Sequence, residues 1–557
     1  MNGNKVQVKN EQYINYELIE TLRLTKFPKP GEIILYGTAG FRTRAELLDH
    51  VAFTMGILSV LRSKKKNAAI GIMITASHNP ENDNGLKLVD PSGEMLESSW
   101  EKIATDLVNI DDRELVPQLK KIIKELDINE TLPATVILGR DTRISSPQLA
   151  MSAIQGINAC QATLKDFEIV TTPQLHYLVA STNANGSYGD PSLFGYYQKL
   201  SVAFKNIRGN RTDNGNYFGK LQLDAANGVG ALAVKQFQEH LNGFIDIDVY
   251  NNGNGQLNHK CGADYVKIEQ CPPSNLPVIS NMRCVSIDGD ADRIVYYYTD
   301  EENKFHLLDG DRIATLIAEY FKELLLESQL ILNVGLVQTA YANGGSTDYI
   351  TNKLKIPVAC VPTGVKHLHH KALEFDIGIY FEANGHGTIV FKDSATELIR
   401  QAAKNESLSE NKREAAKKLS QVIDVINQTV GDALSDMLLV ETILHAKKWN
   451  LNDWEQSYRD LPNKQLKVKV LDRNAITTMD AERKCVLPEG LQTTIDQLVM
   501  RYSKGRSFVR PSGTEDIVRV YAECENKADV EKLAVQVGVA VFNLANGVGQ
   551  KPVLSKM

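Results

Sequence analysis

AAIGIMITASHNPENDNGLK, residues 68–87, joins an apolar strand pattern to a polar loop that begins where the pattern ends. The run of small and branched apolar residues predicts a buried strand. Ser77 and His78 follow at the carboxyl end of this strand, where α/β proteins place their ligands. Lys87 closes the segment with a cation. A lone serine in a turn is usually only a turn residue, but the whole string favours a reactive loop around Ser77.

Apolar runs of strand type alternate with helical patterns on both sides of this segment. The alternation predicts an α/β fold with three related α/β domains, built on mixed parallel sheets, and a smaller C-terminal α+β domain. The predicted strands include 32–37, 134–141, 220–226, 329–334, 356–361 and 377–382. The predicted helices include 147–160, 231–241 and 395–418. The predicted domains span 1–180, 181–299, 300–446 and 455–557.

Composition and charge are those of a globular protein that does not bind polyanions. The 557 residues are 43% hydrophobic and 23% charged, and the net charge of −6 argues against nucleic acid or an anionic membrane as partner. Seven cysteines without a C-x-x-C pair predict neither a zinc site nor a disulfide framework. The polar N-terminus lacks the apolar core of a signal peptide. We therefore expect a cytoplasmic protein.

A second polar loop, CVSIDGDADR, carries three carboxylates at alternate positions: Asp288, Asp290 and Asp292. Each pair at 4 Å repels by roughly 1 kcal/mol even in water, and a hard divalent cation with oxygen ligands removes that cost. A calcium loop of the EF-hand type is excluded, because Arg293 and Thr299 stand where that loop needs glycine and glutamate. The pattern favours magnesium over the plainer alternative of a solvated acidic turn.

A third loop, RPSGTED, follows Arg506 and precedes Arg519. Successive backbone N–H groups at 512–514 can form a concave anion site, and Arg510 offers a planar fork that suits phosphate. This loop would supply locally the positive charge that the acidic chain lacks overall. The plainer alternative is an ordinary turn between a helix and a strand.

Two further strand-end loops resemble sugar contacts. FEANGHG, residues 381–387, directs several polar groups to one place, and Glu382 could accept hydrogen bonds from neighbouring hydroxyls. VPTGVKH, residues 361–367, is a similar loop. Each of these loops by itself is more often structural than functional.

One segment imitates a dinucleotide-binding fingerprint. Gly228, Gly230 and Ala233 follow a strand and open a helix, and Asp248 lies some twenty residues further on. The pattern is short and common, and it explains none of the other loops. A tight turn between strand and helix is the preferred interpretation.

The strings TASHNP, DGDADR, FEANGHG and RPSGTED, in this order across nearly the whole chain, resemble the α-D-phosphohexomutase superfamily. YGTAGFR, residues 36–42, and FEANGHG resemble its phosphoacetylglucosamine mutase branch. The resemblance implies four domains around a central cleft, each contributing one loop. These would be a phosphoserine loop, a metal loop, a sugar-binding loop and a phosphate-binding loop, in chain order.

The resemblance also implies roles for individual residues. Ser77 would be the phosphoserine, and its phosphate with the three aspartates would bind one Mg²⁺ per chain. Arg42, Lys87, His78 and His386 would lie near the transferring group, with Lys87 and His386 as candidates for proton transfer. The residues expected to bind substrate are Arg293, Thr363, Gly364, Glu382, Asn384, Gly385, Arg510, Ser512, Gly513, Thr514 and Arg519.

The reaction that the resemblance implies interconverts the 6- and 1-phosphates of N-acetylglucosamine through a 1,6-bisphosphate, and so supplies UDP-N-acetylglucosamine synthesis. Asn384 stands where many superfamily members have serine, which favours an acetamido sugar. A second departure is that GRDTR, residues 139–143, follows the serine loop instead of preceding it. Phosphoglucomutase or phosphomannomutase activity, a metal-dependent phosphatase and an inactive binding protein remain alternatives, and monomer or dimer stays open.

Overall fold

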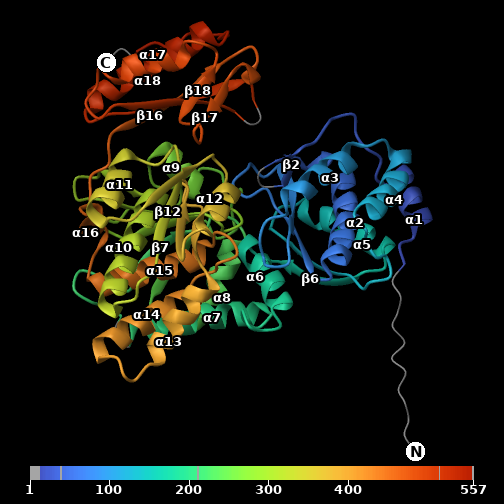
Figure 1. Ribbon diagram of the computed structural model, residues 1–557, viewed down its shortest axis with the longest axis horizontal. Coiled ribbons are helices and arrows are strands. Elements are labelled where there is room, and N and C mark those ends of the chain that lie inside the picture. The colour runs from blue at the N-terminus through green and yellow to red at the C-terminus, as the bar shows by residue number, and fades with distance from the viewer. Residues whose placement is uncertain (1–12, 38–39, 210–211, 513–514, 555–557) are drawn as a thin grey trace, which may run out of the picture. The chain divides into compact units, whose positions relative to one another are not determined.

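The computed structural model describes residues 13–37, 40–209, 212–512 and 515–554 (Figure 1). The chain forms two compact units. The first comprises Met1–Asp213, Phe218–Leu307 and Asp424–Leu439. The second comprises Asn214–Tyr217, Leu308–Ile423 and Val440–Met557.

The first unit opens with a six-stranded sheet in the order β1-β2-β4-β3-β5-β6. Strands β3, β5 and β6 run parallel, whereas β4 runs antiparallel to β2 and β3. The strands are β1 Tyr36–Gly37, β2 Gly40–Arg44, β3 Ile70–Ile74, β4 Asp83–Val89, β5 Thr135–Arg140 and β6 Thr163–Ile169. The helices of this region are α1 Tyr16–Thr25, α2 Asp49–Lys66, α3 Ser98–Asn109, α4 Leu115–Glu125, α5 Ser146–Ala159 and α6 Thr172–Asn183.

Helix α2 is the centre of the first core, and nearly all of its residues are buried. It packs closely on α5 because two glycines remove side chains from the contact. A Cβ on Gly56 would lie 2.2 Å from the carbonyl oxygen of Ala153, and a Cβ on Gly156 would lie 2.2 Å from that of Phe53. A helix buried on all sides has little amphipathic pattern, which is the state expected inside a large core.

A second sheet completes the first unit, in the order β11-β10-β9-β7-β8. Strands β7, β8 and β9 run parallel and β10 pairs antiparallel with β9. The strands are β7 Lys220–Asp224, β8 Asp246–Tyr250, β9 Cys284–Ile287, β10 Ile294–Thr299 and β11 Phe305–Leu308. The helices are α7 Leu193–Arg208, α8 Gly230–Leu241 and α9 Ala263–Glu269.

The second unit contains a four-stranded sheet in the order β13-β12-β14-β15, with β12 parallel to β13 and β14, and β15 antiparallel to β14. The strands are β12 Val334–Thr339, β13 Val358–Val361, β14 Ile377–Phe381 and β15 Gly387–Phe391. The helices are α10 Gly310–Ser328, α11 Gly344–Asp348, α12 Val365–Ala372 and α13 Asp393–Lys404. Helices α14 Glu410–Val425 and α15 Ala433–Lys447 follow, and each contains the residue at which one unit gives way to the other.

The C-terminal part of the second unit is a small antiparallel sheet in the order β16-β20-β19, beside a two-stranded hairpin of β17 and β18. Helices α17 and α18 cover one face of this sheet (Figure 1). The elements are α16 Leu451–Glu455, β16 Asn463–Lys469, β17 Thr477–Met479, β18 Lys484–Leu487, α17 Leu491–Val499, β19 Arg506–Pro511, β20 Ile517–Glu523 and α18 Lys527–Leu544.

The predicted mixture of α/β sheets with a small C-terminal α+β part is confirmed. Two predicted strands are wrong. Residues 32–35 lie outside any strand, because the side-chain amide of Asn109 bonds both the N–H and the C=O of Ile34 in place of a neighbouring strand. The strand predicted at 329–334 begins only at Val334, and Ile331 is exposed in the preceding loop.

The single helix predicted over 395–418 is two helices, α13 and α14, separated by Asn405–Ser409. The side chain of Asn405 accepts hydrogen bonds from the N–H and the hydroxyl of Ser407. Such local side-chain bonds compete with a continuous helix. Within the described residues, no helix is long and apolar enough to cross a membrane.

Candidate active site

Ser77 lies between β3 and β4 in a backbone conformation that side chains rarely adopt. Its φ is +52°, in the left-handed region, and its side chain is buried. Its N–H donates to the Thr75 hydroxyl at 2.9 Å, and its own hydroxyl donates to Asp288 Oδ2 at 2.7 Å. Strained backbone of this kind persists where surrounding contacts hold it, commonly at functional sites.

Residues of the out-of-order GRDTR segment provide much of that support. Arg143 Nη2 donates to the carbonyl oxygens of Ser77 and Asn79, at 3.0 and 2.9 Å. Asp141 pairs with Arg143 Nε at 3.0 Å and accepts the Thr75 hydroxyl at 2.8 Å. The segment meets the serine loop because β3 and β5 are parallel neighbours, so their carboxyl ends adjoin.

Sequence reasoning did not single out Asn258, which braces the same loop. Its side-chain amide donates to the carbonyl oxygens of Ser77 at 2.8 Å and Asn79 at 3.1 Å. The residue lies in a polar stretch without a motif, so no local pattern indicated it. The support for Asn258 and Arg143 as positioning groups comes from the tertiary contacts alone.

Asp288, Asp290 and Asp292 form one buried cluster, with an oxygen of each within 4.8 Å of the others. Burial, followed by the charges of Asp292 and Asp290, raises the pKa of Asp288 well above its usual range. Asp290 Oδ1 is buried without a hydrogen-bond partner among the described residues. Crowded carboxylates with such an oxygen are a donor set that fits a hard divalent cation, as predicted.

The dinucleotide-like turn at 228–230 supports this aspartate loop. A Cβ on Gly228 would lie 2.3 Å from the carbonyl oxygen of Gly289, and that oxygen accepts the Val229 N–H at 3.1 Å. The glycine is therefore required for close packing of the two loops, which accounts for the pattern without a nucleotide.

Cationic groups border the aspartates. Lys87 lies on β4, not in the loop itself, with Nζ 4.0 Å from Asp290 Oδ2 and 3.9 Å from Asp292 Oδ2. Arg293 donates to Asp264 at 2.7 Å and approaches Asp288 at 3.9 Å. Both residues lie where positive charge offsets the carboxylates.

Arg42 and His78 are also in the first unit, close to this cluster. Burial lowers the pKa of Arg42 from its usual value, against the attraction of Asp290. Burial and the charge of Arg293 lower the pKa of His78 to about 3. Its Nδ1 lies 3.4 Å from the Ser77 hydroxyl oxygen. A neutral imidazole beside Ser77 can position the serine, whereas it is not a ready proton donor at neutral pH.

The sugar-loop residues are together at one end of β14 in the second unit. Glu382 Oε1 accepts the N–H of Gly364 at 3.2 Å, and Asn384 Nδ2 lies 3.4 Å from Glu382 Oε2. Asn384 Oδ1 in turn accepts the N–H of His386 at 3.0 Å. Gly385, with φ of +86°, makes the tight turn possible.

The predicted phosphate loop joins β19 to β20. Arg510 and Arg519 are directly opposed cross-strand partners, and the Glu482 carboxylate, 2.8 Å from Arg510 Nε, offsets the repulsion between their like charges. The N–H of Ser512 donates to the carbonyl oxygen of Ile517 at 2.8 Å. Gly513 and Thr514, predicted to contact phosphate, lie outside the described residues.

Arg506, which precedes this loop in the sequence, has a structural role. Its Nε pairs with the buried Glu523 at 2.7 Å, and its Nη atoms donate to the carbonyl oxygens of Ala340 and Ala342 at 2.8 and 2.6 Å. The side chain therefore ties the C-terminal sheet to the end of β12.

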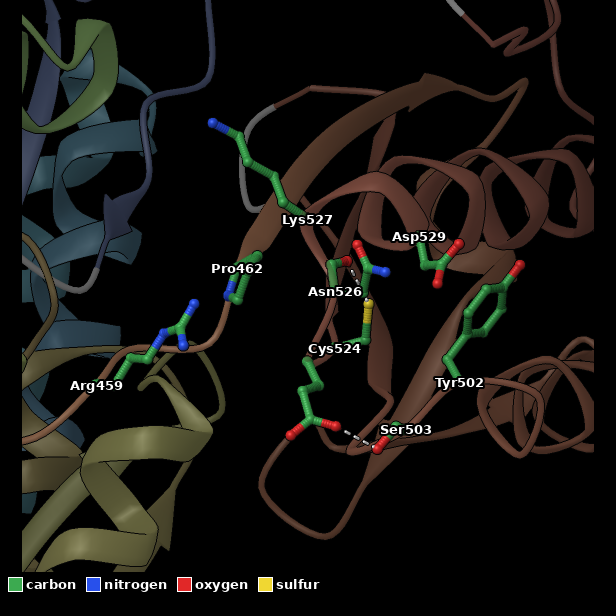
Figure 2. Close-up of a pocket in the computed structure, with 9 residues that line it drawn as sticks. Arg459, Pro462, Tyr502, Ser503, Cys524, Asn526, Lys527 and Asp529 are labelled. Carbon is green, nitrogen blue, oxygen red and sulfur yellow. Dashed lines mark hydrogen bonds between the residues drawn. The ribbon is translucent and has the colours of Figure 1, made fainter.

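A cavity of about 590 Å³ in the second unit, lined by the start of α18 and neighbouring loops, lies apart from these residues (Figure 2). Within it, Ser503 donates to Glu525 at 2.6 Å and the Cys524 thiol donates to the carbonyl oxygen of Asn526 at 3.2 Å. None of its lining residues belongs to the predicted site. The cavity has no part in the predicted chemistry.

Three family models match the chain. Domain III of phosphoacetylglucosamine mutase AMG1 matches residues 309–449. The C-terminal domain of phosphoglucomutase/phosphomannomutase matches 464–538, and α/β/α domain I of the same family matches 50–115 and 108–188. These matched ranges contain the serine, sugar and phosphate loops, and the aspartate loop at 288–292 lies between two of them.

Similar proteins agree with these models. Phosphoacetylglucosamine mutase of Sus scrofa is 53% identical, over 94% of this chain and 97% of the relative. A structure of Aspergillus fumigatus N-acetylphosphoglucosamine mutase has a TM-score of 0.92 at 46% identity, covering 96% of this chain and 99% of that one. A second structure of that enzyme, in complex with GlcNAc-6P and magnesium, has a TM-score of 0.91 at 46% identity, covering 95% and 99%.

Proposed function

Because the chain belongs to the phosphoacetylglucosamine mutase family, we propose that it interconverts N-acetylglucosamine 6-phosphate and 1-phosphate through a phosphoserine at Ser77. It is then an intramolecular phosphotransferase, an isomerase. The observation that carries the proposal is the Ser77 hydroxyl, 2.7 Å from Asp288 in a buried cluster of three carboxylates. A nucleophile beside a cation-binding cluster is the arrangement that reversible phosphoryl transfer needs.

In the forward reaction, the bond between Ser77 Oγ and phosphorus breaks as the free sugar hydroxyl bonds to the same phosphorus, giving a bound 1,6-bisphosphate. The sugar hydroxyl loses its proton and the released Ser77 oxygen takes one up, with Lys87 and His386 as the groups assigned to these transfers. The intermediate turns over, and its other phosphoryl group returns to Ser77. A magnesium ion held by the three aspartates would neutralise charge on the transferring oxygens. Arg42 and Arg293 add fixed positive charge there.

The second unit supplies the groups that hold the sugar in this scheme. Glu382 accepts hydrogen bonds from sugar hydroxyls, and Asn384 with Gly385 accommodates the acetamido group. Thr363 and Gly364 complete this side. Arg510, Ser512, Gly513, Thr514 and Arg519 bind whichever phosphate is not reacting, because the bisphosphate must be held in both orientations.

The same proposal includes the four domains at 1–180, 181–299, 300–446 and 455–557, and a cytoplasmic enzyme that supplies UDP-N-acetylglucosamine synthesis. The ligand and metal of the Aspergillus fumigatus relative support the substrate and cofactor.

The test is a substrate panel with added 1,6-bisphosphate, in which ³¹P resonances of the sugar 1- and 6-phosphates are followed. We expect exchange with N-acetylglucosamine phosphate at a higher kcat/KM than with glucose or mannose phosphate. A higher kcat/KM for glucose phosphate would instead establish a phosphoglucomutase, and net release of inorganic phosphate would establish a phosphatase. Mass spectrometry of Ser77 after incubation with bisphosphate tests the covalent step.

A further inference from the structure

The turn of the β17–β18 hairpin brings a carboxylate to the predicted phosphate loop. Asp480, Ala481 and Glu482 all have φ between 53° and 67°, in the left-handed region. Three successive residues in this conformation are costly unless tertiary contacts repay them. The side chain of Glu482 is mostly buried, with 16% of its surface exposed. Its contacts therefore require an explanation beyond an ordinary surface turn.

Glu482 binds two predicted substrate residues at once. Its Oε1 accepts Arg510 Nε at 2.8 Å, and its Oε2 accepts both the N–H and the hydroxyl of Thr363, at 3.0 and 2.6 Å. Thr363 follows β13, whereas Arg510 is the penultimate residue of β19. One carboxylate thus joins the loop of the four-stranded sheet to the loop of the C-terminal sheet.

The connection continues to the sugar loop. Gly364, next to Thr363, donates its N–H to Glu382 Oε1 at 3.2 Å. These contacts form a chain within the second unit. It runs from Arg510 to Glu482, then to the Thr363–Gly364 peptide and from there to Glu382. It links a group that we assign to phosphate with a group that we assign to sugar hydroxyls.

Glu482 is not what holds these two parts of the second unit together. Arg506 and the buried Glu523 already join β19 and β20 to Ala340, Ala342 and Gly344. Arg312 makes a further tie, to Asp460 at 2.8 Å. Loss of the Glu482 carboxylate therefore leaves the scaffold contacts in place.

We propose that Glu482 is a positioning residue, which orients the Arg510 guanidinium relative to Thr363, Gly364 and Glu382 so that the phosphate and sugar contacts share one fixed geometry. A carboxylate on Nε fixes the plane of the guanidinium, and a fork fixed in advance binds phosphate with less loss of side-chain freedom. The inference rests on the proposed function. An Arg510 without this orientation would release the bisphosphate intermediate more often, leaving Ser77 unphosphorylated.

The experiment compares Glu482→Gln and Glu482→Ala with Asp480→Asn, a matched change in the same turn, where Asp480 pairs only with Arg483 in the interactions described. We expect both Glu482 variants to lose about tenfold in kcat/KM, mainly through KM, because a charge-assisted hydrogen bond is lost. They should also need several-fold more added bisphosphate for half-maximal activity. Asp480→Asn should behave as wild type, and the melting temperature of the isosteric Glu482→Gln should stay close to that of wild type.

A double-mutant cycle separates positioning from general disturbance. Because lysine lacks the Nε fork, Glu482→Gln should add little to the loss in an Arg510→Lys background. Wild-type KM and bisphosphate requirement in Glu482→Gln, or full additivity with Arg510→Lys, would overturn the proposal. If Glu482→Ala fails to fold, the isosteric Glu482→Gln decides.

Failure of the proposed function is recognised separately, as an inactive wild type in the same assay. The orientation of Arg510 is then tested by measuring the melting temperature at increasing concentrations of inorganic phosphate. Wild type and Asp480→Asn should be stabilised at lower phosphate concentration than Glu482→Gln. Equal responses would overturn the positioning role whatever reaction the enzyme catalyses.

Discussion

The serine–aspartate region of the first unit and the sugar–phosphate region of the second differ in how deeply their side chains are buried and in which contacts hold them. Ser77 and the three aspartates are between 0% and 4% exposed, and buried backbone-directed bonds from Arg143 and Asn258 hold the loop. Arg510 and Glu482 have side chains 21% and 16% exposed and are held by side-chain contacts. The groups that we assign to the reaction are thus fully buried and held through backbone carbonyl groups, whereas the groups that we assign to phosphate binding are partly exposed and held by other side chains.

The largest expected effect concerns the serine–aspartate region. Ser77→Ala should lower turnover by at least about 10⁴-fold, because it removes the only hydroxyl assigned to carry the phosphoryl group. Circular dichroism should be unchanged, and labelled bisphosphate should leave no phosphate on the protein. Ser187→Ala, an exposed serine of the same unit, serves as control. Retained mutase activity in folded Ser77→Ala would remove Ser77 from its role.

The aspartates should show opposite effects on activity and stability. Asp290→Asn should lower magnesium-dependent turnover by about 10²-fold or more, as should chelation of the wild type. In metal-free buffer the same variant should melt at a higher temperature, because removing one of three crowded buried charges relieves repulsion of about 1–4 kcal/mol per pair. A lower metal-free melting temperature would contradict the account of a cluster that needs a cation.

Two arginines of β19 should differ in what they affect. We expect Arg510 to affect substrate binding and Arg506 to affect the stability of the fold. Arg510→Lys should raise KM about tenfold through loss of bidentate phosphate contact, with little change in melting temperature. Arg506→Lys should instead lower the free energy of unfolding by about 2 kcal/mol, because Glu523 and two carbonyl groups lose their partners. Steady-state kinetics and thermal unfolding on both variants test the contrast. Equal effects on KM would show that Arg506 also acts on substrate.

The smallest effect concerns sugar choice. Asn384→Ser places the residue of many superfamily members in the sugar loop, where Asn384 contacts Glu382 and His386. The ratio of kcat/KM for N-acetylglucosamine phosphate over glucose phosphate should fall about tenfold, which is the size expected if the Asn384 side chain makes one contact with the acetamido group. Competition between the two substrates measures this ratio directly. An unchanged ratio would move acetamido recognition to another residue.

Much of the chemistry followed from the sequence because each loop is a local event. In each case an apolar strand pattern is followed directly by the polar groups: Ser77, the alternating aspartates or the FEANGHG string. A few neighbouring residues therefore indicate both where the strand ends and which reactive groups follow it. Errors arose where a side chain replaced a strand partner, as Asn109 does at Ile34. The hairpin of β17 and β18 was not predicted, because its strands are short and mostly exposed.

By itself, the sequence determined the family and which polar residues follow the apolar runs, and hence the candidates for the nucleophile and the metal ligands. Only the tertiary structure decided the partners: Ser77 meets Asp288 across 211 residues, Arg143 and Asn258 converge on one turn, and Glu482 reaches both Thr363 and Arg510. The physical reason is the separation along the chain over which each property is set. Backbone periodicity is encoded over a few neighbouring residues, whereas a side chain's partner depends on which strand ends and turns the folded core brings together.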